Sequence, residues 1–171
     1  FYVLLVGAGI GCWLWFLADN YLHRIKKRVD DPMRHTLFSL LCLIGAVLLI
    51  PLIHYTRGST LTIVYGTILF MGWITGIIMG KSFKTLPFIV WNAHYKDLTG
   101  QVKVPLPREL YREGWVRWQL WLYVVSVAAL VIGIASGQLI IVRIATWAWL
   151  GLAVLYTLNI GQILFHKKKL N

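Results

Sequence analysis

The sequence predicts an all-α protein, a polytopic transmembrane helix bundle of about five spans that forms a single domain over residues 1–171. Of the residues, 58% are apolar and only 13% are charged, whereas a soluble domain carries about 25% charged residues. The apolar residues also fall in blocks of roughly 17 to 25, the length that a helix needs to cross ~30 Å of hydrocarbon. Because so little polar surface is available to cover a globule in water, an integral membrane protein is expected.

Five apolar blocks define the predicted spans, and each is bounded by polar or turn-forming residues. The blocks are residues 1–18, 37–55, 61–80, 116–136 and 138–165. The first block has no basic segment in front of it, so it does not have the pattern of an intact signal peptide. Residue 1 is Phe and the first methionine is Met33, and we therefore expect the chain to be part of a longer polypeptide.

The basic residues predict the orientation of the spans. Fifteen of the 17 lysines and arginines lie in segments 19–36 and 81–117 or in the C-terminal tail, which are alternate connections. Positive residues mark the cytoplasmic side of a membrane, so the N-terminal end is expected outside and the C-terminus in the cytoplasm. Charge divided among juxtamembrane segments suits anionic lipid headgroups and argues against nucleic acid as a partner. The basic residues expected to face lipid or partners are Arg24, Lys26, Lys27, Arg28, Lys81 and Lys84.

The end of the third span, Gly80-Lys81-Ser82, resembles the end of a phosphate-binding loop. Such a loop needs a glycine five positions before Gly80, where this chain has Thr75, and it needs a preceding strand. The alternative is a glycine ridge, the residues Gly72, Gly76 and Gly80, which lie four apart on one helix face. Gly7 and Gly11 form a shorter ridge on the first span. Glycines at this spacing let two helix backbones approach closely, and packing within the chain is favoured over a dimerisation face.

Segment 81–115 is the largest part predicted outside the bilayer. A straight helix over residues 61–95 would be about 52 Å long and would overshoot the membrane, so Pro87 is expected to break it. Residues 85–95 are then expected to form an interfacial or re-entrant segment, with Trp91 and Tyr95 at the headgroups. Residues 95–115 are expected to dock partners.

The histidines give little support for a cofactor. Only His54 lies in a predicted span, and a haem or metal role for it would need a second ligand from outside the chain. The sequence favours an interfacial His54 and leaves the haem role open as a speculative alternative. The remaining histidines are expected at the surface: His23, His35, His94 and His166.

Catalytic groups are also sparse in the predicted spans. No Asp or Glu falls inside a span core, and no nucleophile and base can be paired from the sequence. Asn159 and Gln162, near the inner end of the fifth span, are expected to make interhelical hydrogen bonds. The sequence thus favours a chain that is not an enzyme by itself.

The segments "HRIKKRVDDPMRHT" and "GKSFKTLPFIVWNAHYKDLTGQVKVPLPRELY" resemble the C-terminal half of bacterial multi-pass proteins similar to the haem–copper oxidase catalytic subunit. The resemblance implies location in the bacterial cytoplasmic (inner) membrane and association with a respiratory chain. In that family the third of these helices carries a His-x-His pair that ligates haem. Residues 61–80 contain no histidine, so no haem ligand is carried over to this chain.

Three hypotheses follow from these observations. The first is a non-catalytic subunit or fragment of a bacterial respiratory or redox membrane assembly, in contact with lipids and other membrane subunits. The second is part of a transporter or permease, since a broken third helix would expose half-helix termini that build substrate sites. The third is a haem-binding membrane electron carrier that uses His54. The sequence indicates neither a cofactor nor a small-molecule substrate.

Overall fold

A computed structural model describes residues 2–23, 29–99 and 104–166, and its regular elements are helices. Four helices stand as single elements: α1 (Tyr2–Leu22), α2 (Asp31–Thr56), α5 (Glu113–Ser136) and α6 (Leu139–Leu164). Between α2 and α5 runs one long helix made of α3 (Ser59–Thr67), the π-helical η1 (Ile68–Ile74) and α4 (Thr75–Tyr95). Two short 3₁₀ turns follow it, η2 (Lys96–Leu98) and η3 (Pro107–Leu110).

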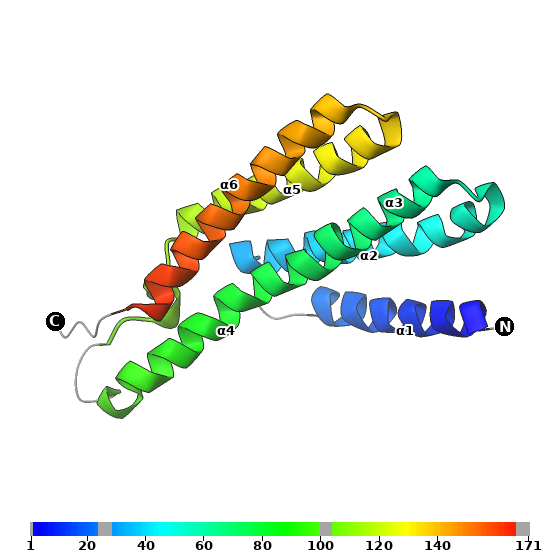
Figure 1. The fold of residues 1–171 in the computed structure, drawn as a ribbon. Coiled ribbons are helices and arrows are strands. Elements are labelled where there is room, and N and C mark those ends of the chain that lie inside the picture. The colour runs from blue at the N-terminus through cyan, green and yellow to red at the C-terminus, as the bar shows by residue number, and fades with distance from the viewer. Residues whose placement is uncertain (1, 24–28, 100–103, 167–171) are drawn as a thin grey trace.

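Successive helices alternate in direction, so the connections gather at two ends of the bundle (Figure 1). The tight turns after α2 and after α5 lie at the same end as the N-terminus. Residues 104–112, which lead into α5, lie at the other end, with the C-terminal end of α6 (Figure 1). The α5–α6 hairpin packs on α2 and the long helix, while α1 lies apart from that hairpin (Figure 1).

The described residues contain four helices that are long and apolar enough to cross a membrane. These are Asp31–Thr56, Ser59–Leu98, Glu113–Ser136 and Leu139–Leu164. The all-α fold is therefore confirmed, and four of the five predicted spans coincide with membrane-length helices. The first predicted span is helical as α1 but is not one of these four, so its crossing stays a prediction, as does the side on which each end lies.

The ends of the helices follow from local sequence. Pro32 lies in the first turn of α2, where a missing backbone N–H removes no helical hydrogen bond. Helix α5 stops at Gly137, whose φ of +68° is in the left-handed region that favours glycine. The Gln138 N–H then donates to the Gly133 carbonyl at 3.0 Å. The predicted turn at 136–138 is thus present and closes a helical hairpin.

The predicted break at Pro87 is wrong. The helix runs through Pro87, and together with η2 the helical stretch extends over 40 residues, from Ser59 to Leu98. Proline removes one hydrogen bond to the preceding turn, but the Pro87 side chain is less than 2% exposed, and its packing holds the helix together across the defect. At 1.5 Å per residue the helix is about 60 Å long, twice the ~30 Å of hydrocarbon. A membrane-spanning helix of this length projects beyond the hydrocarbon instead of breaking.

Residues 85–95 are accordingly not a separate interfacial segment. Tyr95 is completely buried, and the Trp91 indole N–H donates to the Pro105 carbonyl at 2.6 Å. The expectation that both rings lie at the headgroups is not supported for Tyr95, because its ring is covered by the protein itself. Trp91 instead holds Pro105 against the end of α4, and the Tyr95 hydroxyl lies 2.9 Å from His166 Nε2.

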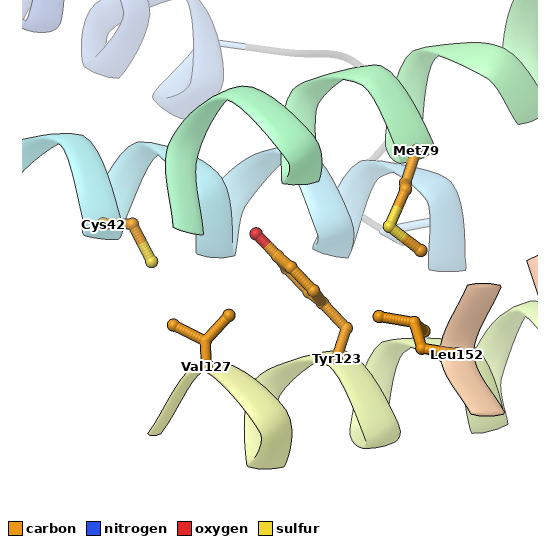
Figure 2. Packing of buried hydrophobic residues seen from close by; sticks show 5 residues of the cluster. All are labelled: Cys42, Met79, Tyr123, Val127 and Leu152. Carbon is orange, nitrogen blue, oxygen red and sulfur yellow. The ribbon is translucent and has the colours of Figure 1, made fainter. Parts of the chain in front are cut away.

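Buried apolar side chains form two clusters along the bundle. The first joins α2, α4, α5 and α6 through Cys42, Met79, Tyr123, Val127 and Leu152. Figure 2 shows Tyr123 projecting from α5, with its hydroxyl directed towards α2 and the long helix. The second cluster lies nearer the C-terminal end of α4 and consists of Phe83, Val90, Leu110, Val116 and Ile163.

Candidate functional site

The glycine ridge packs inside the chain. A Cβ added at Gly72 would lie 2.9 Å from Cys42 Cβ, and one at Gly80 would lie 2.8 Å from the Pro32 carbonyl oxygen. At Gly76 the added atom would meet the Tyr123 hydroxyl, and it would lie 2.7 Å from Ser39 Cβ. All three glycines thus allow α2 to approach the long helix closely, which is the packing interpretation of the ridge.

The shorter ridge on α1 has no such contact. A Cβ at Gly7 or Gly11 would meet nothing within 4 Å in the described chain. Close packing at these two glycines is therefore absent among the described residues, and a packing role for them stays a prediction. An open apolar groove runs between α1 and α2 here, lined by Val6, Gly7 and Val47.

The π-helical segment η1 is held by Tyr123. Within η1 the hydrogen bonds span five residues, as between the Thr75 N–H and the Phe70 carbonyl, and such widening disturbs the regular pattern of the neighbouring carbonyls. The Tyr123 hydroxyl donates to the Met71 carbonyl at 3.1 Å and also contacts the Gly72 carbonyl. The Tyr123 side chain of α5 is therefore hydrogen-bonded to the irregular part of the long helix.

Tyr123→Phe is expected to destabilise the bundle by about 1–3 kcal/mol, because a buried carbonyl loses its donor while the ring stays in place. Thermal unfolding of the detergent-solubilised protein measures the effect. Tyr55→Phe is the control, since Tyr55 is 89% exposed and should tolerate the change. Equal melting temperatures for the two variants would show that the Tyr123 hydroxyl contributes nothing.

A charged pocket of about 400 Å³ lies where the N-terminal ends of α2 and α5 meet the segment before α5. Asp31 is its centre: the carboxylate lies 3.4 Å from Arg34 and 3.3 Å from Arg117, and its side chain is 10% exposed. The ion pair with Arg117 ties α2 to α5 across the pocket. The charged residues that line it are Asp30, Asp31, Arg34, Arg108, Glu113 and Arg117.

Tyr111 completes the wall of the charged pocket. Burial, together with the carboxylates of Glu113, Asp30 and Asp31, raises the pKa of the Tyr111 hydroxyl to about 12, against a smaller opposing effect of Arg108. The phenol therefore stays neutral at physiological pH. The pocket contains three arginines and three carboxylates, so it is electrically balanced and suits polar partners of either sign.

The predicted basic surface is only partly within the described residues. Lys81 and Lys84 are exposed on α4, and the Lys84 ammonium donates to the Met33 sulfur at 3.8 Å. Their exposure agrees with contact to headgroups or partners. Arg24, Lys26, Lys27 and Arg28 lie outside the described residues.

His54 is exposed in the last turn of α2. Among the described residues, no three His, Cys, Asp or Glu side chains come together in a group that could hold a metal ion. The other histidines lie near the opposite end of the bundle (Figure 1): His35 is near the start of α2, and His23, His94 and His166 are at the ends of α1, α4 and α6. No other histidine of the described chain is therefore placed to serve as a second axial ligand for a haem at His54.

Two of the histidines expected at the surface are in contact with buried groups. His35 is completely buried, and its Nε2 lies 3.4 Å from the Val116 carbonyl oxygen, so the surface expectation for this residue is wrong. His166 is partly buried, and its Nε2 lies 2.9 Å from the Tyr95 hydroxyl. His35 was misplaced because the charged residues beside it in the sequence suggested a loop, whereas α2 already begins at Asp31.

The sequence indicates Asn159 and Gln162 as polar side chains between helices, but Gln162 is exposed, and the sequence reasoning missed Gln119. Gln119 and Asn159 are both 0% exposed, and neither amide has a hydrogen-bond partner among the described residues. The interhelical hydrogen bond expected of Asn159 is therefore not present in this part of the chain. The available signal for Gln119 was a single amide within an apolar run, "WQLW".

Comparison of the chain with protein-family models, with curated proteins and with solved structures finds no match. What the protein does must therefore be argued from its own residues.

Proposed function

We propose that this chain is a non-catalytic helical module of a larger membrane assembly, a subunit or fragment whose work is to hold other membrane-embedded components in place. The observation that carries the proposal is the low burial of the membrane-length helices: the rest of the described chain covers only a small share of each. In the order of the chain, 28%, 17%, 33% and 11% of the apolar windows of the four helices are buried. Most of their surface is left for lipid or for other helices.

The shape of the bundle favours other helices over lipid alone. The groove between α1 and α2 is open, and the glycines that face no neighbour there offer the close approach that helix–helix contacts use. Large aromatic side chains also project from the bundle; Trp15, Trp118, Trp121 and Trp147 are each more than 60% exposed. A module with such surfaces is expected to be completed by neighbouring subunits.

The end of the bundle with the charged pocket is the proposed docking face for a partner outside the hydrocarbon. The proposed face comprises the end of α4, η2, η3 and the first turn of α5, within the predicted docking segment 95–115. Glu109 accepts a hydrogen bond from the Leu106 N–H at 3.2 Å, and Trp91 holds Pro105, so the described part of this segment is fixed in one shape. A fixed polar surface loses little entropy on binding a partner.

The assignment to a bacterial respiratory or redox assembly in the inner membrane is supported by the resemblance of two segments to haem–copper-oxidase-like proteins. No structural observation supports either of the other two hypotheses, the transporter part and the electron carrier. The transporter hypothesis depended on a broken third helix, and the helix is continuous at Pro87. The electron-carrier hypothesis depends on His54, and the other histidines of the described chain lie near the opposite end of the bundle.

Gentle solubilisation and co-purification test the proposal. The chain of 19.6 kDa is expected in a larger particle that contains cytochromes, with no haem that persists on this chain after its partners are stripped away. Arg108→Glu, at the charged pocket, should weaken recovery of the partner. Arg143→Glu, an exposed arginine near the start of α6, is the matched control. Migration as a free chain under conditions that keep known respiratory complexes intact would overturn the proposal, and a persistent haem signal lost in His54→Ala would favour the electron carrier.

A further inference from the structure

Three polar side chains lie in the interior of the bundle without the partners that such groups require. His35 of α2, Gln119 of α5 and Asn159 of α6 are each 0% exposed. His35 Nδ1 and both amide atoms of Gln119 and Asn159 have no hydrogen-bond partner among the described residues. A buried polar group left unsatisfied costs free energy, so the group that completes these hydrogen bonds needs to be identified.

Gln119 lies level with His35. The His35 ring contacts α5 at two places, since its Nε2 lies 3.4 Å from the Val116 carbonyl oxygen and its ring centroid lies 5.8 Å from that of Tyr123. Gln119 follows Val116 by three residues and precedes Tyr123 by four, so the three share one face of α5. The Gln119 amide therefore lies between the two points at which His35 meets this helix.

Asn159 approaches the same place from α6. Val116 and Ile163 belong to one buried cluster with Phe83, and Tyr156 packs against that cluster. Asn159 lies three residues after Tyr156 and four before Ile163, which puts it on the same face of α6. It is thus directed towards the level of Val116, the residue whose carbonyl faces His35.

The chemistry of the three side chains indicates a small neutral guest. With His35 Nε2–H donating to the Val116 carbonyl, Nδ1 carries a lone pair and can only accept. The two carboxamides each offer donors and an acceptor. Water, with two protons and two lone pairs, complements such a mixed set, and buried waters make about three hydrogen bonds each to groups of this kind. None of the three side chains is an acid, so the site lacks the carboxylate that a buried cation normally requires.

We propose that His35, Gln119 and Asn159 form an internal water-binding site between α2, α5 and α6. The charged pocket is the expected route of entry. Asp31 in that pocket precedes His35 by four residues and so lies on the same face of α2, and Arg117 directly follows Val116. Water that passes beside the Asp31–Arg117 ion pair needs to travel one helical turn to reach His35.

Radiolytic footprinting of the whole chain in ¹⁸O-labelled water tests the site, because hydroxyl radicals formed from a bound water oxidise the side chains beside it. His35 is expected to incorporate ¹⁸O although it is buried. Cys42 serves as an internal control: its thiol is intrinsically more reactive than histidine, yet it lies in the buried apolar cluster with Tyr123 and Val127 and should stay unlabelled. Labelling of His35 no greater than that of Cys42 would overturn the proposal.

The double variant Gln119→Leu, Asn159→Leu is expected to lower the labelling of His35 severalfold, since water would lose most of its partners. Gln162→Leu, which changes an exposed amide on the same helix, should leave it unchanged. The single Leu variants give the same comparison if the double variant does not fold. Unchanged labelling in folded variants would contradict the site. Protection of His35 by sodium but not by choline would identify a cation as the occupant and would also contradict it.

Discussion

Phe83→Ala is expected to lower the free energy of unfolding by about 3–5 kcal/mol, the usual cost of deleting a buried aromatic ring. Phe83 is 1% exposed and lies at the centre of the cluster that includes Val116 and Ile163. Its ring centroid is 5.6 Å from that of Tyr111 and 5.8 Å from that of Tyr156. The ring therefore connects α4 both to α6 and to the segment before α5, and the cavity left by alanine would loosen the proposed docking face.

Unfolding of the detergent-solubilised protein by heat or by added SDS measures this loss. Phe88→Ala is the matched control, because Phe88 is on the same helix but is 55% exposed, and its removal leaves no internal cavity. A Phe83→Ala protein as stable as Phe88→Ala would mean that the end of α4 does not pack on α6 as described.

Gly76→Leu is expected to destabilise the bundle by about 1–3 kcal/mol or more, as overpacking of a close contact does. A Cβ at this position would meet the Tyr123 hydroxyl and would lie 2.7 Å from Ser39 Cβ, so α2 and α5 would both have to move. Displacement of Tyr123 would also remove the donor of the Met71 carbonyl in η1. We expect a lower yield of folded protein and a lower midpoint of unfolding.

The control for this substitution is Gly66→Leu on the same long helix, where an added Cβ would meet nothing within 4 Å. It separates close packing from the general effect of a larger side chain. If Gly76→Leu assembled and unfolded like Gly66→Leu, the close approach of the two helices at the glycine ridge would be refuted.

The course of the helices was largely predictable from the sequence, because membrane-length apolar blocks separated by charged or turn-forming residues allow few arrangements. The four membrane-length helices and the turn at Gly137 follow from such local signals. The glycine spacing likewise indicated which face of the third helix would be packed, since the four-residue repeat is a property of that helix alone.

The environment of single residues was not predictable in the same way. Pro87 stays within a helix because the surrounding protein packs around its ring, and nothing local in the sequence encodes that packing. His35 is buried because Val116 and Tyr123, more than 80 residues later in the chain, lie against it. Contacts between distant segments decide both cases, and a single sequence does not report them.

The measurement that tests the account most directly is the accessibility of single introduced cysteines to a membrane-impermeant maleimide in intact cells. Ser59→Cys and Gln138→Cys lie at the tight-turn end, and Thr99→Cys and Glu109→Cys lie at the end with the charged pocket; all four positions are exposed. The natural Cys12 and Cys42 lie in helices α1 and α2, and the unchanged chain controls for their reactivity. A membrane-spanning module with an outward N-terminal end predicts labelling of the first pair in intact cells and of the second pair only after permeabilisation. Labelling of all four from the same side would contradict it.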